Sequence, residues 1–289
     1  MKYIFLFSVF FSFLPFAVSS EKEGELVFSD EFSEDGAPNS EKWYFEHGFV
    51  RNMELQWYTP KNTYCKGGFL VIEARKEKVK NPQFGREPKD YWAYGREDAE
   101  YTSSSIVTKN SFDFKKGRLE VRARIPFGKG AWPAIWLLGE NIRDKSNFIP
   151  WPACGEIDVM EFYRIGGVPN ILANFAWEGS NNGSFWNDKK IPVSHFLKKD
   201  PDWFANFHVW RMDWDEKSYR IYLDGELLNE MPLDKSINAG KHKGINPFLN
   251  PKFLLMNLAI GNPKEGKGPV DDNAMPMRYE IDYVRVYKF

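Results

Sequence analysis

Three carboxylates, Glu156, Asp158 and Glu161, lie within the short apolar run Gly155–Phe162. The other residues of this run have the composition of a β-strand. On a regular strand Glu156 and Asp158 share one face, whereas Glu161 points to the opposite face. A β-bulge near Val159–Met160 inserts one extra residue and turns Glu161 to the same side as the other two. We therefore expect a bulged strand with three acids on one surface.

Crowded carboxylates raise one another's pKa, which places a proton donor beside an ionised nucleophile. This pairing predicts cleavage of a glycosidic bond. The alternative is a solvated strand face, since most acids are simply exposed charges. The flanking residues favour chemistry, because Trp151–Gly155 precedes the run and Phe162 and Tyr163 end it, so the acids have aromatic neighbours.

Alternation of apolar and polar residues recurs along the chain and predicts many short strands. The clearest is Arg118–Ile125, and Asp224-Gly225 is a hairpin turn dipeptide. Further strands are predicted at Phe69–Ala74, Ser104–Lys109, Ala134–Leu138, Ile171–Trp177, Phe207–Trp214, Tyr219–Leu223, Phe253–Ile260 and Tyr279–Tyr287. No linker or repeat divides the chain. We expect an all-β domain, a β-sandwich of jelly-roll type with a concave carbohydrate-binding cleft.

The first residues, 1–19, have the pattern of a secretory signal peptide, which leaves 20–289 as a single domain. The expected location is secreted or periplasmic, with no membrane span after cleavage. The formal net charge of −1 and the lack of a basic run argue against a nucleic-acid partner. Cys65 and Cys154 could form a disulfide in an exported chain, but two buried free thiols are the simpler interpretation.

Aromatic residues make up 17% of the chain, including eleven Trp. A glycan cleft needs aromatic platforms, because sugars present flat apolar C–H faces. Trp132, Trp136 and Trp151 surround the acidic strand in sequence, and Trp177 is a further candidate. Core packing is the alternative for any single Trp. Trp210 and Trp214, on a strongly alternating strand, are assigned to the core.

The acidic run Glu156-Ile-Asp-Val-Met-Glu161 resembles the Glu-x-Asp-x-x-Glu signature of family 16 glycoside hydrolases, in the form typical of laminarinase-like enzymes. Other segments in the family's order are Leu26–Phe32, Asn52–Tyr58, Leu70–Lys76, Tyr101–Ser103, Gly117–Ile125, Ala131–Leu138, Trp151–Phe162, Asn257–Gly261 and Asp282–Tyr287. The resemblance covers essentially the whole chain after residue 19. It implies a jelly-roll fold, retaining chemistry and an endo-acting cleft for β-glucan.

The resemblance makes Glu156 the nucleophile, Glu161 the acid/base and Asp158 the residue that supports the nucleophile. A retaining enzyme needs its two carboxyls about 5–5.5 Å apart. The resemblance also places substrate contacts at Asn52, Glu54, Trp132, Trp136, Trp151 and Asn257. A His that is common on the next strand is replaced here by Trp177, which leaves β-1,3-glucan and mixed-linkage β-1,3-1,4-glucan as equally plausible substrates.

No cofactor is required by this chemistry. The family implies a structural calcium, held by Asp282 with the carbonyl oxygens of Glu31 and Gly68; oxygen ligands suit that ion, although Asp282 could equally be an ordinary strand carboxylate. The expected partner is a β-glucan polysaccharide bound by a monomer. Three alternatives stay open: a non-catalytic polysaccharide-binding protein, a galactan hydrolase and a transglycosylase.

Overall fold

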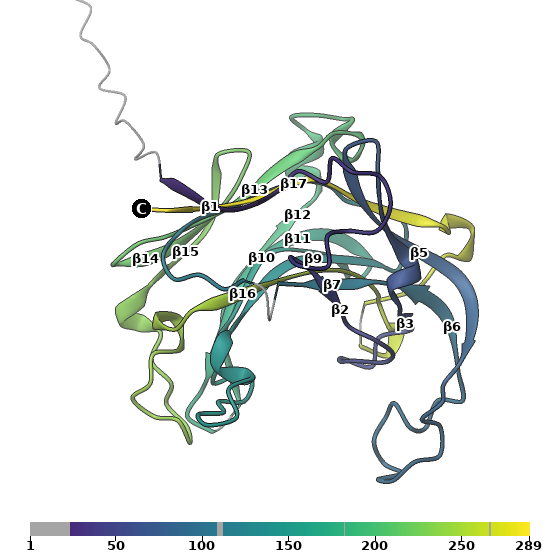
Figure 1. Ribbon diagram of the computed structural model, residues 1–289, viewed down its shortest axis with the longest axis horizontal. Coiled ribbons are helices and arrows are strands. Elements are labelled where there is room, and N and C mark those ends of the chain that lie inside the picture. Colours follow the sequence, from purple (N-terminus) through teal and green to yellow (C-terminus); the bar gives the residue numbers. More distant parts are fainter. Residues whose placement is uncertain (1–23, 109–111, 182, 266) are drawn as a thin grey trace, which may run out of the picture.

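The computed structural model describes residues 24–108, 112–181, 183–265 and 267–289, so the predicted signal peptide lies outside the described residues. Two β-sheets stack as layers and confirm the predicted sandwich (Figure 1). The larger sheet contains β1 (Glu25–Asp30), β3 (Gln56–Tyr58), β4 (Thr63–Lys66), β5 (Phe69–Lys80), β6 (Asp98–Ser103), β8 (Gly117–Arg124), β13 (His208–Trp214), β14 (Ser218–Leu223), β15 (Glu226–Pro232) and β17 (Met277–Lys288). The smaller sheet contains β2 (Tyr44–Phe45), β7 (Ser105–Val107), β9 (Ala131–Gly139), β10 (Glu156–Ile165), β11 (Val168–Glu178), β12 (Ser184–Pro192) and β16 (Lys252–Ile260).

Helical structure among the described residues is short and lies in the connections. It consists of α1 (Ser194–Leu197) and the 3-10 turns η1 (Pro60–Asn62), η2 (Glu140–Ile142), η3 (Trp203–Ala205), η4 (Leu233–Lys235), η5 (Pro247–Leu249), η6 (Pro263–Glu265) and η7 (Asp272–Ala274). No helix in the described ranges has the length and apolar character needed to cross a membrane.

Strand β8 shows how the sequence pattern builds the larger sheet. Its residues alternate strictly between buried and half-buried, as the alternation of apolar and charged residues predicts. The same sheet holds β13 and β14, which correspond to two of the predicted strands and pair antiparallel. Asp224 and Gly225 then adopt left-handed φ values of 49° and 84° in the turn to β15, which is the backbone that a two-residue hairpin requires.

The core lies between the two layers, where the inner faces of the sheets meet. Trp210 and Trp214 are fully buried there, which confirms their assignment to the core. Cys65 on β4 and Cys154 just before β10 are both buried and free, which confirms the simpler interpretation of the two thiols.

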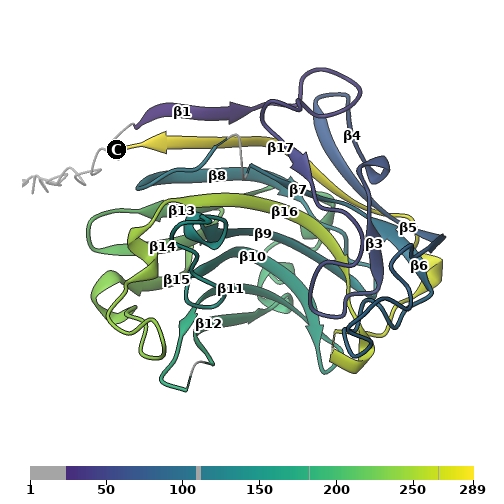
Figure 2. The same cartoon turned by 60° about the horizontal axis from the view of Figure 1, so that its bottom comes forward.

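Strand β10 carries the three acids and lies inside the smaller sheet, hydrogen-bonded to β9 on one side and β11 on the other. Figure 2 shows β16, β9, β10, β11 and β12 in a row. Residues of β9, β10 and β11 are mostly buried on both faces, because one face packs on the core and the other forms the floor of a cleft.

Candidate active site

A β-bulge interrupts β10 where the acids require it. Pairing with β11 is regular to Asp158, opposite Asn174, and resumes at Glu161, opposite Leu172. Pairing with β9 shifts between Asp158 and Met160. Glu156, Asp158 and Glu161 consequently line the same cleft, which confirms the predicted bulge near Val159–Met160.

The chain enters β10 through Gly155, which has a left-handed φ of 78°. A Cβ atom at this position would lie 2.9 Å from the Cβ of Pro247. Both the backbone conformation and the close approach therefore require glycine directly before Glu156. This turn sets the backbone direction at Glu156, the first residue of β10, directly after the loop that carries Trp151.

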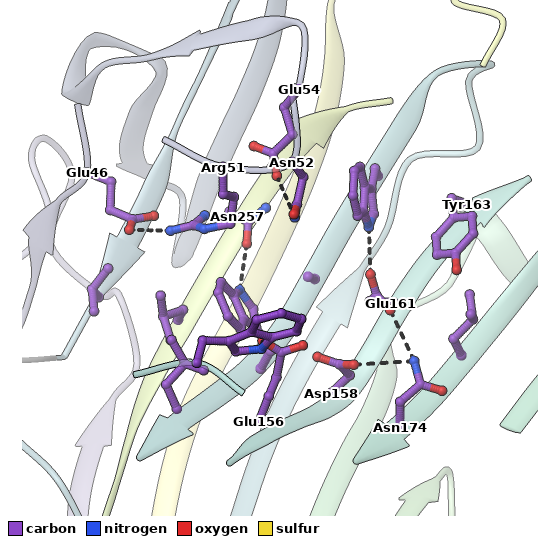
Figure 3. Close-up of a pocket in the computed structure, with 18 of the residues that line it drawn as sticks. Glu46, Arg51, Asn52, Glu54, Glu156, Asp158, Glu161, Tyr163, Asn174 and Asn257 are labelled. Atoms are coloured by element: carbon purple, nitrogen blue, oxygen red, sulfur yellow. Dashed lines mark hydrogen bonds and ion pairs between the residues drawn. The ribbon is translucent and has the colours of Figure 1, made fainter. Parts of the chain in front are cut away.

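Each of the three acids on β10 accepts a hydrogen bond from a neutral side chain. Trp151 Nε1 donates to Glu156 Oε2 at 3.0 Å, and Trp132 Nε1 donates to Glu161 Oε1 at 2.8 Å. Asn174 Nδ2 on β11 donates to Asp158 Oδ2 at 3.3 Å and to Glu161 Oε2 at 3.1 Å. Figure 3 shows Asn174 between these two carboxylates. These hydrogen bonds hold the three acids in fixed directions.

Burial dominates the electrostatics of the three acids. Burial, followed by the charge of Glu161, raises the pKa of Glu156 to about 7. Burial and the charges of both neighbouring glutamates raise the pKa of Asp158 well above its ordinary value. Burial also raises the pKa of Glu161, while Lys267 and the hydrogen bonds from Trp132 and Asn174 oppose that rise. Burial and mutual repulsion therefore favour the protonated forms of all three acids.

The three tryptophans predicted as sugar platforms all line the cleft, but they differ in what they offer to a ligand. The side chain of Trp151 is 47% exposed, so its ring is available for stacking. Trp132 and Trp136 are only 5% and 7% exposed. The ammonium group of Lys267 lies 3.6 Å from the ring centroid of Trp132, and the Arg51 guanidinium lies 4.9 Å from that of Trp136. These two indoles are therefore largely covered, and their rings contact the cationic groups of Lys267 and Arg51.

A polar network holds the other predicted cleft residues in place. Asn257 Oδ1 accepts from Trp136 Nε1 at 2.7 Å, and its Nδ2 donates to the Tyr58 hydroxyl at 3.0 Å. Glu54 is buried and accepts from Gln56 Nε2 at 2.6 Å. Asn52 Nδ2 lies 3.5 Å from Glu54 Oε1. Asn52, Glu54 and Asn257 all line the cleft, so the structure brings them together with the acids.

Trp177 is a correction, because the structure places it in the core and not in the cleft. It is 6% exposed and packs against Phe248 and Phe185, with ring centroids 6.0 and 4.8 Å away. On β11 the side chains of Leu172 and Asn174 face the cleft, and alternation sends Trp177 to the opposite face. The residue that meets the acids from β11 is therefore Asn174.

Sequence reasoning missed Asn174 and several other residues of the cleft. Asn174 lies in an apolar run in which alternation gives no signal. The missed lining residues outside β11 include Arg51, Tyr163, Trp186, Asp188 and Lys267. Two of these, Trp186 and Asp188, lie on β12, an exposed edge strand. This strand was not predicted because its composition is polar. The whole cleft has a volume of about 870 Å³.

One of the predicted calcium ligands, the carboxylate of Asp282, has another partner in this structure. It is paired with Arg122, and a guanidinium on the same carboxylate opposes a divalent cation. The other two predicted ligands are the backbone carbonyl oxygens of Glu31 and Gly68. Within the described ranges, no group of three or more His, Cys, Asp or Glu residues is arranged to hold a metal. Calcium therefore stays an expectation from the family resemblance, and no step below depends on it.

Comparisons with known proteins agree with this geometry. Residues 49–285 match the model of glycosyl hydrolases family 16. The chain belongs to this family. It is therefore a glycoside hydrolase, and the acids on β10 occupy the positions that the resemblance assigns to catalysis.

One relative is the beta-glucanase of Rhodothermus marinus, 34% identical over 92% of this chain and 85% of the relative. The chain spans little more than a third of some longer relatives. The laminarinase catalytic domain from Thermotoga maritima is 34% identical, with a TM-score of 0.73 over 93% of this chain and 99% of that one. Another structure, from work on endo-acting O-glycanases of the human gut microbiota that initiate mucin breakdown, is 32% identical, with a TM-score of 0.79 over 92% and 91% of the two chains.

Proposed function

We propose that this glycoside hydrolase is endo-acting and cleaves β-1,3-glucan or mixed-linkage β-1,3-1,4-glucan with retention of anomeric configuration. The observation that carries the proposal is the bulge that brings Glu156 and Glu161 to one face of β10, in a cleft of about 870 Å³. The beta-glucanase and laminarinase relatives support glucan as the substrate.

In the proposed mechanism, Glu156 attacks the anomeric carbon while Glu161 protonates the departing glycosidic oxygen. The leaving sugar departs, and a glycosyl ester forms on Glu156. Glu161, now a carboxylate, then takes a proton from water, and the resulting attack on the anomeric carbon releases Glu156. The hydrogen bonds from Trp132 and Asn174 suit this cycle, because they stabilise the ionised form of Glu161 in its second half.

Asp158 supports Glu156 in this proposal. Burial and the charges of the two glutamates raise the pKa of Asp158 well above its ordinary value, which favours the protonated form that can donate a hydrogen bond to the carboxylate of Glu156. Asn174 fixes its other oxygen by donating to Oδ2 at 3.3 Å. A neutral Asp158 stabilises the ionised nucleophile without adding a third negative charge.

The test is product analysis after incubation of the protein with laminarin, barley mixed-linkage glucan, agar and xyloglucan. We expect oligosaccharides from one or both of the first two, with an early fall in viscosity because internal bonds break first. Release of products from agar alone would overturn the glucan assignment. Release from neither glucan by a protein that binds both would favour a polysaccharide-binding protein, and long products built onto added oligosaccharides would indicate a transglycosylase.

A second candidate substrate is a mucin O-glycan. The specific observation is that the structure from the O-glycanase work has a higher TM-score than the laminarinase domain, 0.79 against 0.73. The carboxylates do not identify the sugar, so the same mechanism would apply. Incubation with mucin in parallel with the glucans separates the two candidates by the composition of the released oligosaccharides.

The proposal places the enzyme outside the cytoplasm, secreted or periplasmic, after removal of residues 1–19. The apolar segment and the small residues that follow it support this location. Mass spectrometry of the exported protein tests it, with an N-terminus at or near residue 20 as the expected result. The same proposal makes the enzyme a monomer that needs no cofactor, which light scattering and activity after chelation would check.

A further inference from the structure

The connection between β5 and β6 extends from the sheet as an aromatic excursion, defined here as residues 81–97. Figure 1 shows this segment below β6, in blue at the lower right. Asn81 closes its base, since its Nδ2 donates to the carbonyl oxygens of Ala93 and Arg96, both at 2.8 Å. The rings of Tyr91 and Tyr94 meet edge to face at 4.8 Å. The excursion is therefore an ordered element with its own internal contacts.

Arg96 joins this excursion to the segment Asn52–Glu54. Its guanidinium lies over two aromatic rings, 5.0 Å from the centroid of Phe49 and 4.9 Å from that of Trp92. It donates to the carbonyl oxygen of Met53 at 2.8 Å and also to that of Glu54. A planar guanidinium can make this pair of bonds while it also lies against aromatic rings, which an ammonium group cannot do.

The segment that Arg96 holds has an unusual backbone. Asn52 and Met53 both have left-handed φ values, 54° and 48°, which non-glycine residues rarely adopt in succession. The Met53 side chain is 38% exposed, so packing of that side chain does not fix its conformation. Its carbonyl oxygen instead accepts from Arg96 and from Asn262 Nδ2 at 2.9 Å. Such strained backbone persists where the surroundings over-determine it, and it is common at functional sites.

The side chains and the carbonyl groups of this segment have different partners. The side chains of Asn52 and Glu54 line the cleft, whereas Arg96 and the aromatic excursion are not among its lining residues. The hydrogen bonds from Arg96 therefore reach the backbone from outside the lining. They fix the two residues whose side chains face the cleft.

We propose that Arg96 is a positioning residue for substrate binding, because it holds Asn52 and Glu54 in the cleft through the backbone of Met53 and Glu54. This inference rests on the proposed function for its kinetic test, but its structural part does not. Arg96 itself contacts no reacting atom; it acts through the strained segment.

The kinetic experiment compares Arg96→Ala with Arg86→Ala on the glucan that the wild-type enzyme cleaves. Arg86 is an exposed arginine of the same excursion, so the control removes the same charge and a similar side chain. We expect KM to rise about tenfold in Arg96→Ala and to stay at the wild-type value in Arg86→Ala, since a tenfold change corresponds to the loss of a hydrogen bond or two. A purely structural role would instead lower kcat with the folded fraction and leave KM unchanged.

Two further measurements make the test specific. Guanidinium chloride at low millimolar concentration should lower the KM of Arg96→Ala toward the wild-type value, because the ion can occupy the place that the Arg96 guanidinium leaves beside Phe49 and Trp92. Sodium chloride at equal ionic strength should not. Hydrogen exchange of the backbone amides of residues 49–56 should be faster in Arg96→Ala than in Arg86→Ala. The exchange result is independent of any substrate.

Unchanged exchange in residues 49–56 together with an unchanged KM for Arg96→Ala would overturn the proposal. A wild-type enzyme inactive on every glucan would refute the proposed function but leave the exchange comparison valid. Faster exchange with an unchanged KM would show that the segment is held by Arg96 but does not bind substrate, which also contradicts the inference.

Discussion

The indole nitrogen of Trp132 donates a hydrogen bond to Oε1 of Glu161 at 2.8 Å, while the face of the same ring lies 3.6 Å from the Lys267 ammonium. Trp132 therefore connects the proposed acid/base to a positive charge. Its indole N–H stabilises the carboxylate form of Glu161 and so opposes the rise in the pKa of that group that burial causes. Trp132, which the sequence predicts as a sugar platform, is thus placed to influence the pKa of the proposed acid/base.

Replacement of Trp132 by Phe keeps an aromatic ring but removes the N–H. The pKa of Glu161 should rise, so the limb of the kcat/KM profile that reports loss of the catalytic proton should move to higher pH. Loss of one hydrogen bond to a charged group, about 1.5–3 kcal/mol, sets the upper limit of the effect on rate. The control is Trp43→Phe, which removes the 2.7 Å hydrogen bond that the indole nitrogen of Trp43 donates to Asp30. A profile that moves to lower pH, or no more than that of the control, would contradict this role.

The two glutamates should be distinguished by azide rescue. In Glu156→Ala, azide can occupy the vacated nucleophile position and displace an activated aryl leaving group once, which gives the α-glycosyl azide. In Glu161→Ala, the ester on Glu156 still forms, and azide then attacks it to give the β-glycosyl azide. Proton NMR of the anomeric products identifies each. The opposite pair of products would reverse the two roles, and full turnover of unactivated glucan by either variant would exclude double displacement.

The buried acids should lower stability at neutral pH. The pKa of Glu156 is about 7 in the native state against an ordinary 4.5, so the unfolded chain releases this proton first as pH rises. The free energy of unfolding therefore falls between about pH 4.5 and pH 7 and stays low above that range. Glu156→Gln replaces the ionisable carboxyl group by a neutral amide. It should stabilise the protein by on the order of 2 kcal/mol at pH 8, with little effect at pH 4.

Thermal unfolding at the two pH values measures this difference. At pH 8 the midpoint of Glu156→Gln should exceed that of the wild type by several degrees, since about 2–4 °C corresponds to 1 kcal/mol in a domain of this size. Glu34→Gln, at an exposed site, is the matched control. An equal gain at pH 4 and pH 8 would show that the stabilisation does not come from ionisation.

Trp151 and Trp177 should respond to truncation in opposite ways. Trp151→Ala removes an exposed ring at the cleft and should raise KM by about 2-fold to 10-fold, which corresponds to stacking energies of about 0.5–1.5 kcal/mol. Trp177→Ala leaves a cavity in the core and should destabilise the protein by about 3–5 kcal/mol while KM is retained at low temperature. Measurement of KM and of the unfolding midpoint for both variants checks the pair. A normal KM in Trp151→Ala would remove its role as a platform.

The sequence predicted those parts of the site whose residues contradict their local pattern. Glu161 is on the wrong face of a regular strand, and that conflict indicated the bulge. Trp177 could not be placed in the same way, because β11 is buried on both faces and its composition does not show which face meets the cleft. Arg96 was missed for a different reason: it acts on Glu54 from 42 residues away, through a carbonyl group that every residue type possesses.

Strand β12 shows another reason why part of the site could not be predicted from the sequence. Its residues are largely exposed at the edge of the smaller sheet, so no buried face enforces apolar alternation. Trp186 reaches the cleft only because β12 pairs with β11 in a register that sets it opposite Ala176. This pairing forms only in the assembled sheet and cannot be predicted from the sequence of the segment alone.

The bulge in β10 also preserves the register of the sheet. Asp158 and Glu161 are three residues apart in the chain, but they lie opposite Asn174 and Leu172, which are only two residues apart on β11. The extra residue is therefore absorbed locally, and regular pairing continues on both sides of it. A strand with one residue fewer would also carry its acids on a single face. Loss of either Val159 or Met160 would thus leave the two proposed catalytic carboxyls about as far apart along the sheet, and would change the local twist from which Glu161 projects.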